Sequence, residues 1–159
     1  MREDPRNRIS KKALTIWRIT GFISLIIPWL IVIGLFVLTV MFQLPFWIVS
    51  IVIGIILVLS IIVIGIVPSI RWARWRYEVH EHEIDLQHGV FVVRRTLVPM
   101  VRVQHVDTRQ GPILRKYKLA TVTISTAATV HEIPALNIEG ADQLRDYISN
   151  LARAADGDV

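Results

Sequence analysis

The fold is decided by residues 19–70, which read ITGFISLIIPWLIVIGLFVLTVMFQLPFWIVSIVIGIILVLSIIVIGIVPSI. This stretch is a third of the chain and contains no Asp, Glu, Lys, Arg or His. A helix rises about 1.5 Å per residue, and a bilayer core of roughly 30 Å needs about 20 residues per crossing. The stretch is therefore too long for one membrane span and long enough for two.

The middle of the stretch predicts a turn between two spans. Gln43 is its only strongly polar side chain, and Pro45 breaks a helix. We predict a transmembrane helical hairpin with spans near residues 19–41 and 46–67. A helix pair buried in a soluble core is the alternative, but it would need far more chain to cover it. Small residues four apart could let the helices approach closely: Ser50 with Gly54, and Gly65 with Ser69.

The distribution of charge gives the orientation of the hairpin and argues against nucleic-acid binding. The net charge is +5, but residues 1–18 hold six basic and two acidic residues, whereas residues 71–159 hold twelve and eleven. The surplus therefore lies beside the first span, and basic residues mark the cytoplasmic side of short spans. Arg71, Arg74 and Arg76 follow the second span in the same way. We predict that residues 1–18 form a basic cytoplasmic segment and that both termini are cytoplasmic.

Residues 71–155 predict one small cytoplasmic domain built mostly of strands, followed by a short tail at residues 156–159. Short apolar groups recur among polar residues, and Val122 and Ile124 alternate with threonines. Residues 90–93 predict a further strand, which His88-Gly89 would separate from the preceding strand by a tight turn. The end of the chain changes to helical spacing at five apolar positions: Ile138, Ala141, Leu144, Ile148 and Leu151.

Several segments of this domain resemble the core motif of the bacterial pleckstrin-homology-like family, long catalogued as domain of unknown function 304. They are residues 97–99, 102–106, 110–112, 114–115 and 119–127, read as LVP, RVQHV, QGP, LR and LATVTISTA. Two spans followed by a single such domain resemble the YdbS-like membrane proteins of that family. The resemblance implies an α+β domain with a bent, about seven-stranded antiparallel sheet capped by a C-terminal helix. It also implies a bacterial inner-membrane location and a complex with a larger membrane protein that carries several copies of the domain.

The candidate contact residues are basic and lie in the region of the motif. They are Arg94, Arg95, Arg102, Arg109, Arg115, Lys116 and Lys118. As a patch they could contact anionic lipid or a partner's acidic surface; alternatively, they are solvated strand faces offset by the eleven acids. Relatives of the fold that bind inositol phosphates use basic residues in the first strand-to-strand loop. Here that loop, residues 78–84, is acidic, which argues against such binding.

Catalytic and metal sites are not predicted. His80 and His82 share a strand face with carboxylates nearby, but the spacing fixes no third ligand for zinc. His105 is expected to be half-buried and bonded to a backbone carbonyl. The chain has no cysteine, no glycine-rich phosphate loop and no hydrolase motif. We therefore expect no enzyme activity and no cofactor.

The predicted function is that of a membrane-anchored interaction or assembly module, in a complex with itself or with a related membrane protein. The resemblance adds envelope stress or antimicrobial resistance as the process served. The alternative is a lipid-sensing module that recognises anionic headgroups.

Overall fold

The computed structural model describes residues 4–157. The chain divides into two compact units, a helical unit at residues 14–70 and a sheet domain that combines residues 1–13 with residues 71–159. The hairpin is therefore inserted into the sequence of the domain, and the segment before the membrane belongs to the same unit as the segment after it.

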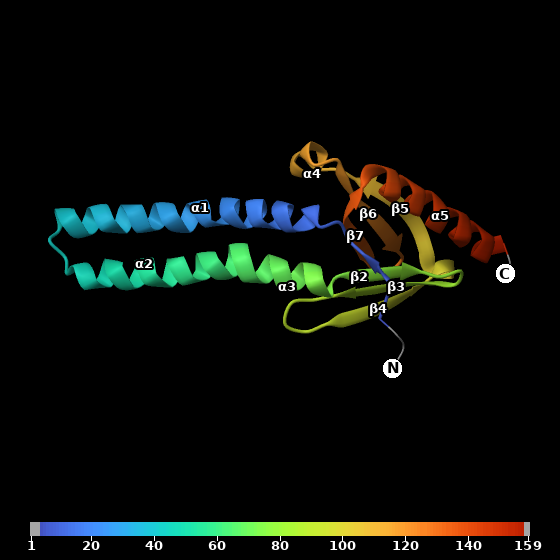
Figure 1. Ribbon diagram of the computed structural model, residues 1–159, viewed down its shortest axis with the longest axis horizontal. Coiled ribbons are helices and arrows are strands. Elements are labelled where there is room, and N and C mark those ends of the chain that lie inside the picture. Colours follow the sequence, from blue (N-terminus) through green and yellow to red (C-terminus); the bar gives the residue numbers. More distant parts are fainter. Residues whose placement is uncertain (1–3, 158–159) are drawn as a thin grey trace. The chain divides into compact units, whose positions relative to one another are not determined.

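The helical unit is an antiparallel pair of long helices (Figure 1). Helix α1 spans Lys12–Met41, and after the turn the second rod consists of α2 (Phe46–Ile61), a π-helical turn η1 (Ile62–Ile66) and α3 (Val67–Arg74). Both rods are long and apolar enough to cross a membrane, and most of their side chains are exposed. An apolar exposed surface is what lipid-facing helices require. Both helices extend beyond the predicted spans, because helical backbone continues into the basic and Trp-rich flanks.

Close approach of the two helices occurs at Gly21. A Cβ at this position would lie 3.2 Å from the Val63 side chain and from the Val63 carbonyl oxygen. Val63 lies in η1, the segment where the helix winds more loosely. The predicted small-residue contacts at Gly54 and Gly65 are wrong, since a Cβ at either would meet nothing within 4 Å.

Among residues 4–157, the sheet domain has seven strands in two antiparallel sheets (Figure 1). The first sheet has the order β1-β2-β3-β4 and the second the order β5-β6-β7. The strand bounds are β1 Asn7–Arg8, β2 Arg76–Val79, β3 Glu83–His88, β4 Arg94–Pro99, β5 Val103–Arg109, β6 Leu119–Thr126 and β7 Val130–Asn137. The connections include a 3-10 turn η2 (Met100–Arg102) and a short helix α4 (Pro112–Lys116), and the chain closes with α5 (Ile138–Gly157). This architecture confirms the predicted α+β fold.

The core lies between the sheets and α5, which packs on β5, η2 and β6. Ile84 and Leu86 come from β3, Ile124 from β6, and Ile148 from α5, and all four are almost completely buried. Strand β6 is buried on both faces, so Thr123 is as inaccessible as its apolar neighbours. The predicted apolar face of α5 is confirmed at Ala141 and Ile148, whereas Leu144 is half-buried. Helix α5 also continues past Ala155 to Gly157, and residues 158–159 of the predicted tail lie outside the described residues.

Strand β1 is an element that the sequence did not predict. Asn7 pairs with Tyr77 and Arg8 with Arg76, so the segment before the first span forms the edge of the first sheet. Ile9 is buried, its carbonyl oxygen accepts a hydrogen bond from Trp72 Nε1 (3.3 Å), and the Ser10 N–H donates to the Ala135 carbonyl (3.2 Å). The N-terminal residues are therefore docked on the domain as well as supplying positive charge.

The predicted strand at residues 90–93 is wrong, because these residues form the loop between β3 and β4. Gly89 has a φ of 138°, which L side chains rarely adopt, and a Cβ there would overlap the Val92 carbonyl oxygen. The backbone therefore turns away from strand geometry directly after His88, despite the β-branched residues that follow.

Candidate functional site

The seven basic residues singled out from the sequence lie in three separate places. Arg94 and Arg95 begin β4, and Arg102 ends η2. Arg109 ends β5, and the connection between β5 and β6 carries the other three: Arg115, Lys116 and Lys118. Since Arg102 and Arg109 flank opposite ends of the seven-residue β5, they are roughly 20 Å apart. The domain therefore does not gather these side chains into one phosphate pocket.

Arg95 is committed to an ion pair inside the first sheet. Its Nη2 lies 2.6 Å and its Nε 3.0 Å from Asp85 Oδ2, and the Asp85 side chain is 3% exposed. Asp85 lies opposite Leu97 in the β3–β4 register, two pairs along from Arg95, so the two side chains lie on the same face of the sheet. The hydrogen bonds to Asp85 raise the pKa of Arg95. Arg95 therefore supplies the hydrogen bonds and the opposite charge that the buried Asp85 carboxylate needs, which is a structural role.

The connection that contains α4 forms the most accessible basic group of the seven. Arg115, Lys116 and Lys118 are exposed, and no acidic residue occurs between residues 108 and 131. Lys118 has a φ of 54°, and its carbonyl oxygen accepts a hydrogen bond from the Ile138 N–H (3.3 Å). Arg109 lies 4.0 Å from Glu132 in an exposed pair. The three side chains on and after α4 are thus available to an anionic surface.

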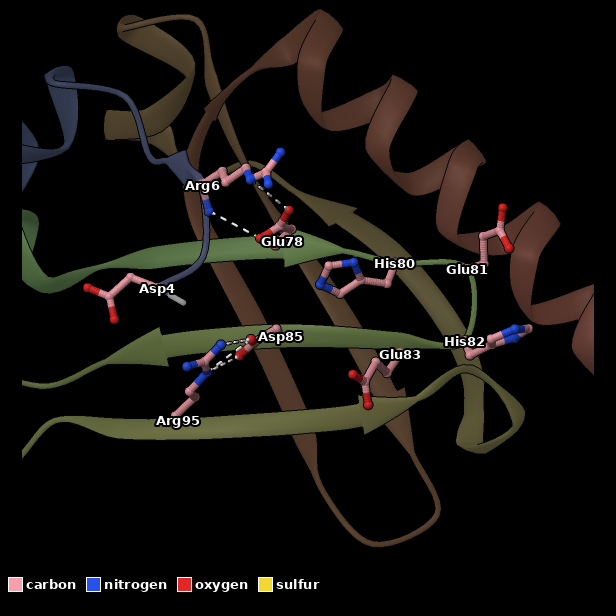
Figure 2. Close-up of a pocket in the computed structure, with 9 residues that line it drawn as sticks. All are labelled: Asp4, Arg6, Glu78, His80, Glu81, His82, Glu83, Asp85 and Arg95. Carbon is pink, nitrogen blue, oxygen red and sulfur yellow. Dashed lines mark hydrogen bonds and ion pairs between the residues drawn. The ribbon is translucent and has the colours of Figure 1, made fainter. Parts of the chain in front are cut away.

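A wide depression of about 780 Å³ lies along the β2–β3 hairpin, and it is acidic (Figure 2). Figure 2 shows the Asp85–Arg95 pair at one end and Glu81 and His82 at the turn. Its lining has five carboxylates and two arginines: Asp4, Glu78, Glu81, Glu83, Asp85, Arg6 and Arg95. This surface repels phosphate groups at neutral pH.

The remaining histidines are not brought into a metal-binding group. Among residues 4–157, no three His, Asp or Glu side chains are placed to hold a metal ion. His80 and His82 line the acidic depression, and both are exposed. The expectation of a half-buried His105 is wrong, because the register shifts between Val103 and His105 and leaves His105 exposed.

A second, more apolar groove of about 510 Å³ runs beside β4. It is lined by most of β4, by Val101 and by the turn between β6 and β7. Leu97 is 44% exposed and Val101 is 58% exposed. Strand β4 is the last strand of its sheet in the described part of the chain, so the groove borders an unpaired sheet edge.

His88, at the end of β3, occupies a confined position against Trp75. The two rings stack with their centroids 5.9 Å apart, and Trp75 is buried. Burial lowers the pKa of His88, and the charges of Arg71, Arg94 and His131 lower it further. The imidazole is therefore kept neutral and serves as a packing surface at the base of the β3–β4 loop.

Comparison with known proteins decides the family. Residues 20–152 match the family described as bacterial PH domain. The chain belongs to the bacterial PH domain family. It is 57% identical to the UPF0699 transmembrane protein YdbS of Bacillus subtilis (strain 168) over 159 residues, which is the full length of both chains. It is also 27% identical over 83 residues to the UPF0699 transmembrane protein YdbT of the same organism, covering 50% of this chain and 17% of YdbT.

No solved structure matches the chain. The family match and the two apolar helices establish a transmembrane protein with one bacterial PH domain. Within this bacterial PH domain, the role of the seven basic residues as a contact surface stays a prediction, and the sequence did not indicate that they lie in separate places. The sequence also did not predict the groove beside β4. The groove borders a free sheet edge, and the order of strands in a sheet cannot be read from the alternation of apolar and polar residues within one strand.

Proposed function

We propose that this chain is a membrane-anchored interaction module whose bacterial PH domain lies in the cytoplasm. Its partner is a second copy of the chain or a related membrane protein of the same family. The partner would add an extended segment to the outer edge of β4 and fill the groove beside it. This mode of association relies on backbone hydrogen bonds for affinity and on side-chain pockets for specificity.

The observation that carries this proposal is the orientation of the backbone at Leu97. The Met100 N–H donates to the His82 carbonyl (2.9 Å), which places this pair in the hydrogen-bonded class of the β3–β4 ladder. Hydrogen-bonded and non-hydrogen-bonded pairs alternate along antiparallel strands. Counting back from Met100, Val98 directs its polar backbone groups toward β3, and Leu97, opposite Asp85, directs its groups away.

The surroundings of this edge favour a short protein segment over an aggregating contact. Arg94 and Arg95 precede the centre of the strand, and Pro99, which has no N–H, ends it. Charges and proline are the features that restrict edge pairing in natural sheets. The accessible part is therefore the segment around Leu97, flanked by the exposed apolar surface of Val101.

Replacing Leu97 by Pro tests the edge directly. Proline removes the outward N–H but leaves the bonds to β3 intact, so the domain should remain folded. Loss of an edge hydrogen bond costs about 0.5–1.5 kcal/mol, and interrupted pairing adds to it. We therefore expect a several-fold drop in co-purification of two differently tagged full-length copies, or of the related partner, from mild detergent at physiological salt.

Leu97→Thr is the matched control, because it keeps the N–H and the preference for strand. It should retain most of the association. Undiminished co-purification of Leu97→Pro would exclude the β4 edge. Wild-type protein that captures neither itself nor a relative from its native membranes would refute the assembly function as a whole.

The cytoplasmic placement of the domain is a separate proposal, supported by the charge distribution. Basic residues precede the first span and follow the second, and residues 41–46 between the helices carry no charge. A reporter active only outside the cytoplasm should work when inserted at Gln43 and should be inactive when fused after Val159. The opposite pattern would invalidate both the orientation and the cytoplasmic partner.

Recognition of anionic headgroups is the second candidate function, and the exposed group on and after α4 favours it. Arg115, Lys116 and Lys118 could each contribute about 1 kcal/mol near an anionic surface. Such attraction weakens as ionic strength rises, whereas pairing at the β4 edge persists. Headgroup-selective binding that resists salt and is abolished by Arg115→Ala would favour lipid sensing over assembly.

A further inference from the structure

The loop between β3 and β4 presents apolar side chains to the outside. It comprises Gly89-Val90-Phe91-Val92-Val93, and we refer to residues 89–93 as the apolar loop. Phe91 is 89% exposed and Val92 is 71% exposed. The turn between β6 and β7, by contrast, has only the small residues Ala127 and Ala128 at its tip. An exposed aromatic residue among valines indicates a surface that is covered in the functional state.

The apolar loop has a defined conformation, because three features fix its base. Gly89 supplies the backbone turn that no other residue would accommodate. An Arg74 guanidinium nitrogen donates a hydrogen bond to the Val90 carbonyl oxygen. Trp75 stacks on His88, the last residue of β3. These three features give the turn a fixed backbone conformation, in which the side chains of Phe91 and Val92 are exposed.

The two residues that anchor the apolar loop lie at the end of the second apolar helix, since Arg74 is the last residue of α3 and Trp75 follows it. Arg74 and Trp75 are the fourth and fifth residues beyond Ile70, the end of the charge-free stretch. At about 1.5 Å per helical residue, Arg74 lies roughly 6 Å along the helix from that end. Because Arg74 donates a hydrogen bond to Val90, the base of the apolar loop is bonded to a residue only four positions beyond the charge-free stretch.

The charges around the apolar loop match a lipid surface. Arg71, Arg74 and Arg94 are close to its base, and residues 71–77 and 86–106 contain no acidic residue. Apolar side chains surrounded by Arg are typical of segments that lie in the headgroup and acyl boundary, where the cations meet anionic lipids. A protein partner would equally cover apolar side chains, but the link to the membrane-exit residues favours lipid.

We propose that the apolar loop inserts Phe91 and Val92 into the interface of the membrane that holds the two helices. The inserted loop forms a second attachment point for the sheet domain and restricts its rotation about the segment that leaves the bilayer. The occupant is the bilayer itself, and the contact needs no specific lipid and no partner protein. The proposal is independent of pairing at the β4 edge, because that edge is centred on Leu97 and the apolar loop ends before β4 begins.

The absence of cysteine makes a site-specific test possible in the full chain. Val92→Cys leaves Phe91 in place, and Glu81→Cys is the matched control in the exposed turn between β2 and β3, away from the groove beside β4. Each is labelled with a nitroxide and placed in nanodiscs of phosphatidylethanolamine and phosphatidylglycerol, and collisions with oxygen and with a water-soluble nickel chelate are measured. We expect high oxygen and low chelate collision rates at position 92, and the reverse at position 81.

Two further measurements separate insertion from the alternatives. Adding Phe91→Asp to Val92→Cys should restore chelate access, and thermal unfolding of this variant should be unchanged because the Phe91 side chain is exposed. Protection at position 92 should persist at high salt, since it comes from apolar insertion. Chelate access at position 92 equal to that at position 81 would overturn the proposal. Protection lost at high salt would also overturn it.

Discussion

Replacing Ile148 by Ala should lower the free energy of unfolding of the bacterial PH domain by about 2–5 kcal/mol. Ile148 is 0% exposed and comes from the face of α5 that packs on β5, η2 and β6. The substitution removes buried methyl groups and leaves a cavity at the junction of the second sheet and the helix. The full-length protein in mild detergent, titrated with urea and followed by pulse proteolysis, gives the stability of the domain.

Leu144→Ala is the matched control, since it lies four residues earlier on the same helix and introduces the same residue. Leu144 is half-buried, so its loss should be clearly smaller than that of Ile148. Equal losses at the two positions would contradict the packing of α5 described above.

Replacing Ile9 by Asp should destabilise the same domain by about 3 kcal/mol or more, although Ile9 precedes the membrane helices. Ile9 is 3% exposed, and its carbonyl oxygen accepts a hydrogen bond from Trp72 Nε1. A carboxylate at this site must either be buried without a partner or detach β1 from β2. The first outcome costs the free energy of burying an unpaired charge, and the second loses the pairing of the N-terminal segment with β2.

Arg6→Ala provides the control for this second prediction. Its side chain is 79% exposed, and the substitution should change stability by no more than about 0.5 kcal/mol. Both variants are measured in the same detergent with the same denaturant. An Ile9→Asp protein as stable as Arg6→Ala would show that the N-terminal segment contributes nothing to the domain.

The hairpin and the general pattern of the domain could be predicted because each follows from local sequence. The charge-free stretch defines two apolar helices, and alternation at Val122 and Ile124 defines a strand. Strand β1 could not be predicted this way, because a two-residue strand has no periodicity and its basic residues already have an explanation as topology determinants. The apolar loop, in contrast, has a composition that is typical of a strand, because it is rich in β-branched valine. The backbone conformation at Gly89 is what keeps these residues from forming one.

The candidate site was predictable only in part, because it depends on how distant segments pair. Arg95 looked available for a ligand, and its commitment to Asp85 appears only when β3 and β4 are in register. The edge of β4 and the separation of Arg102 from Arg109 likewise follow from strand order and strand length. The sequence therefore shows which residues are basic, but the pairing of the strands determines which of these side chains remain accessible.

The docking of β1 also sets an order of events during biosynthesis. Arg8 is synthesised 68 residues before its partner Arg76, with the whole hairpin between them. At about 5–20 residues per second, the first strand waits roughly 3–14 seconds for the strand that receives it. Throughout that interval the N-terminal segment is without the strand on which it docks. Completion of the sheet then links the two ends of the hairpin, so that late folding of the domain fixes an insertion that the ribosome began much earlier.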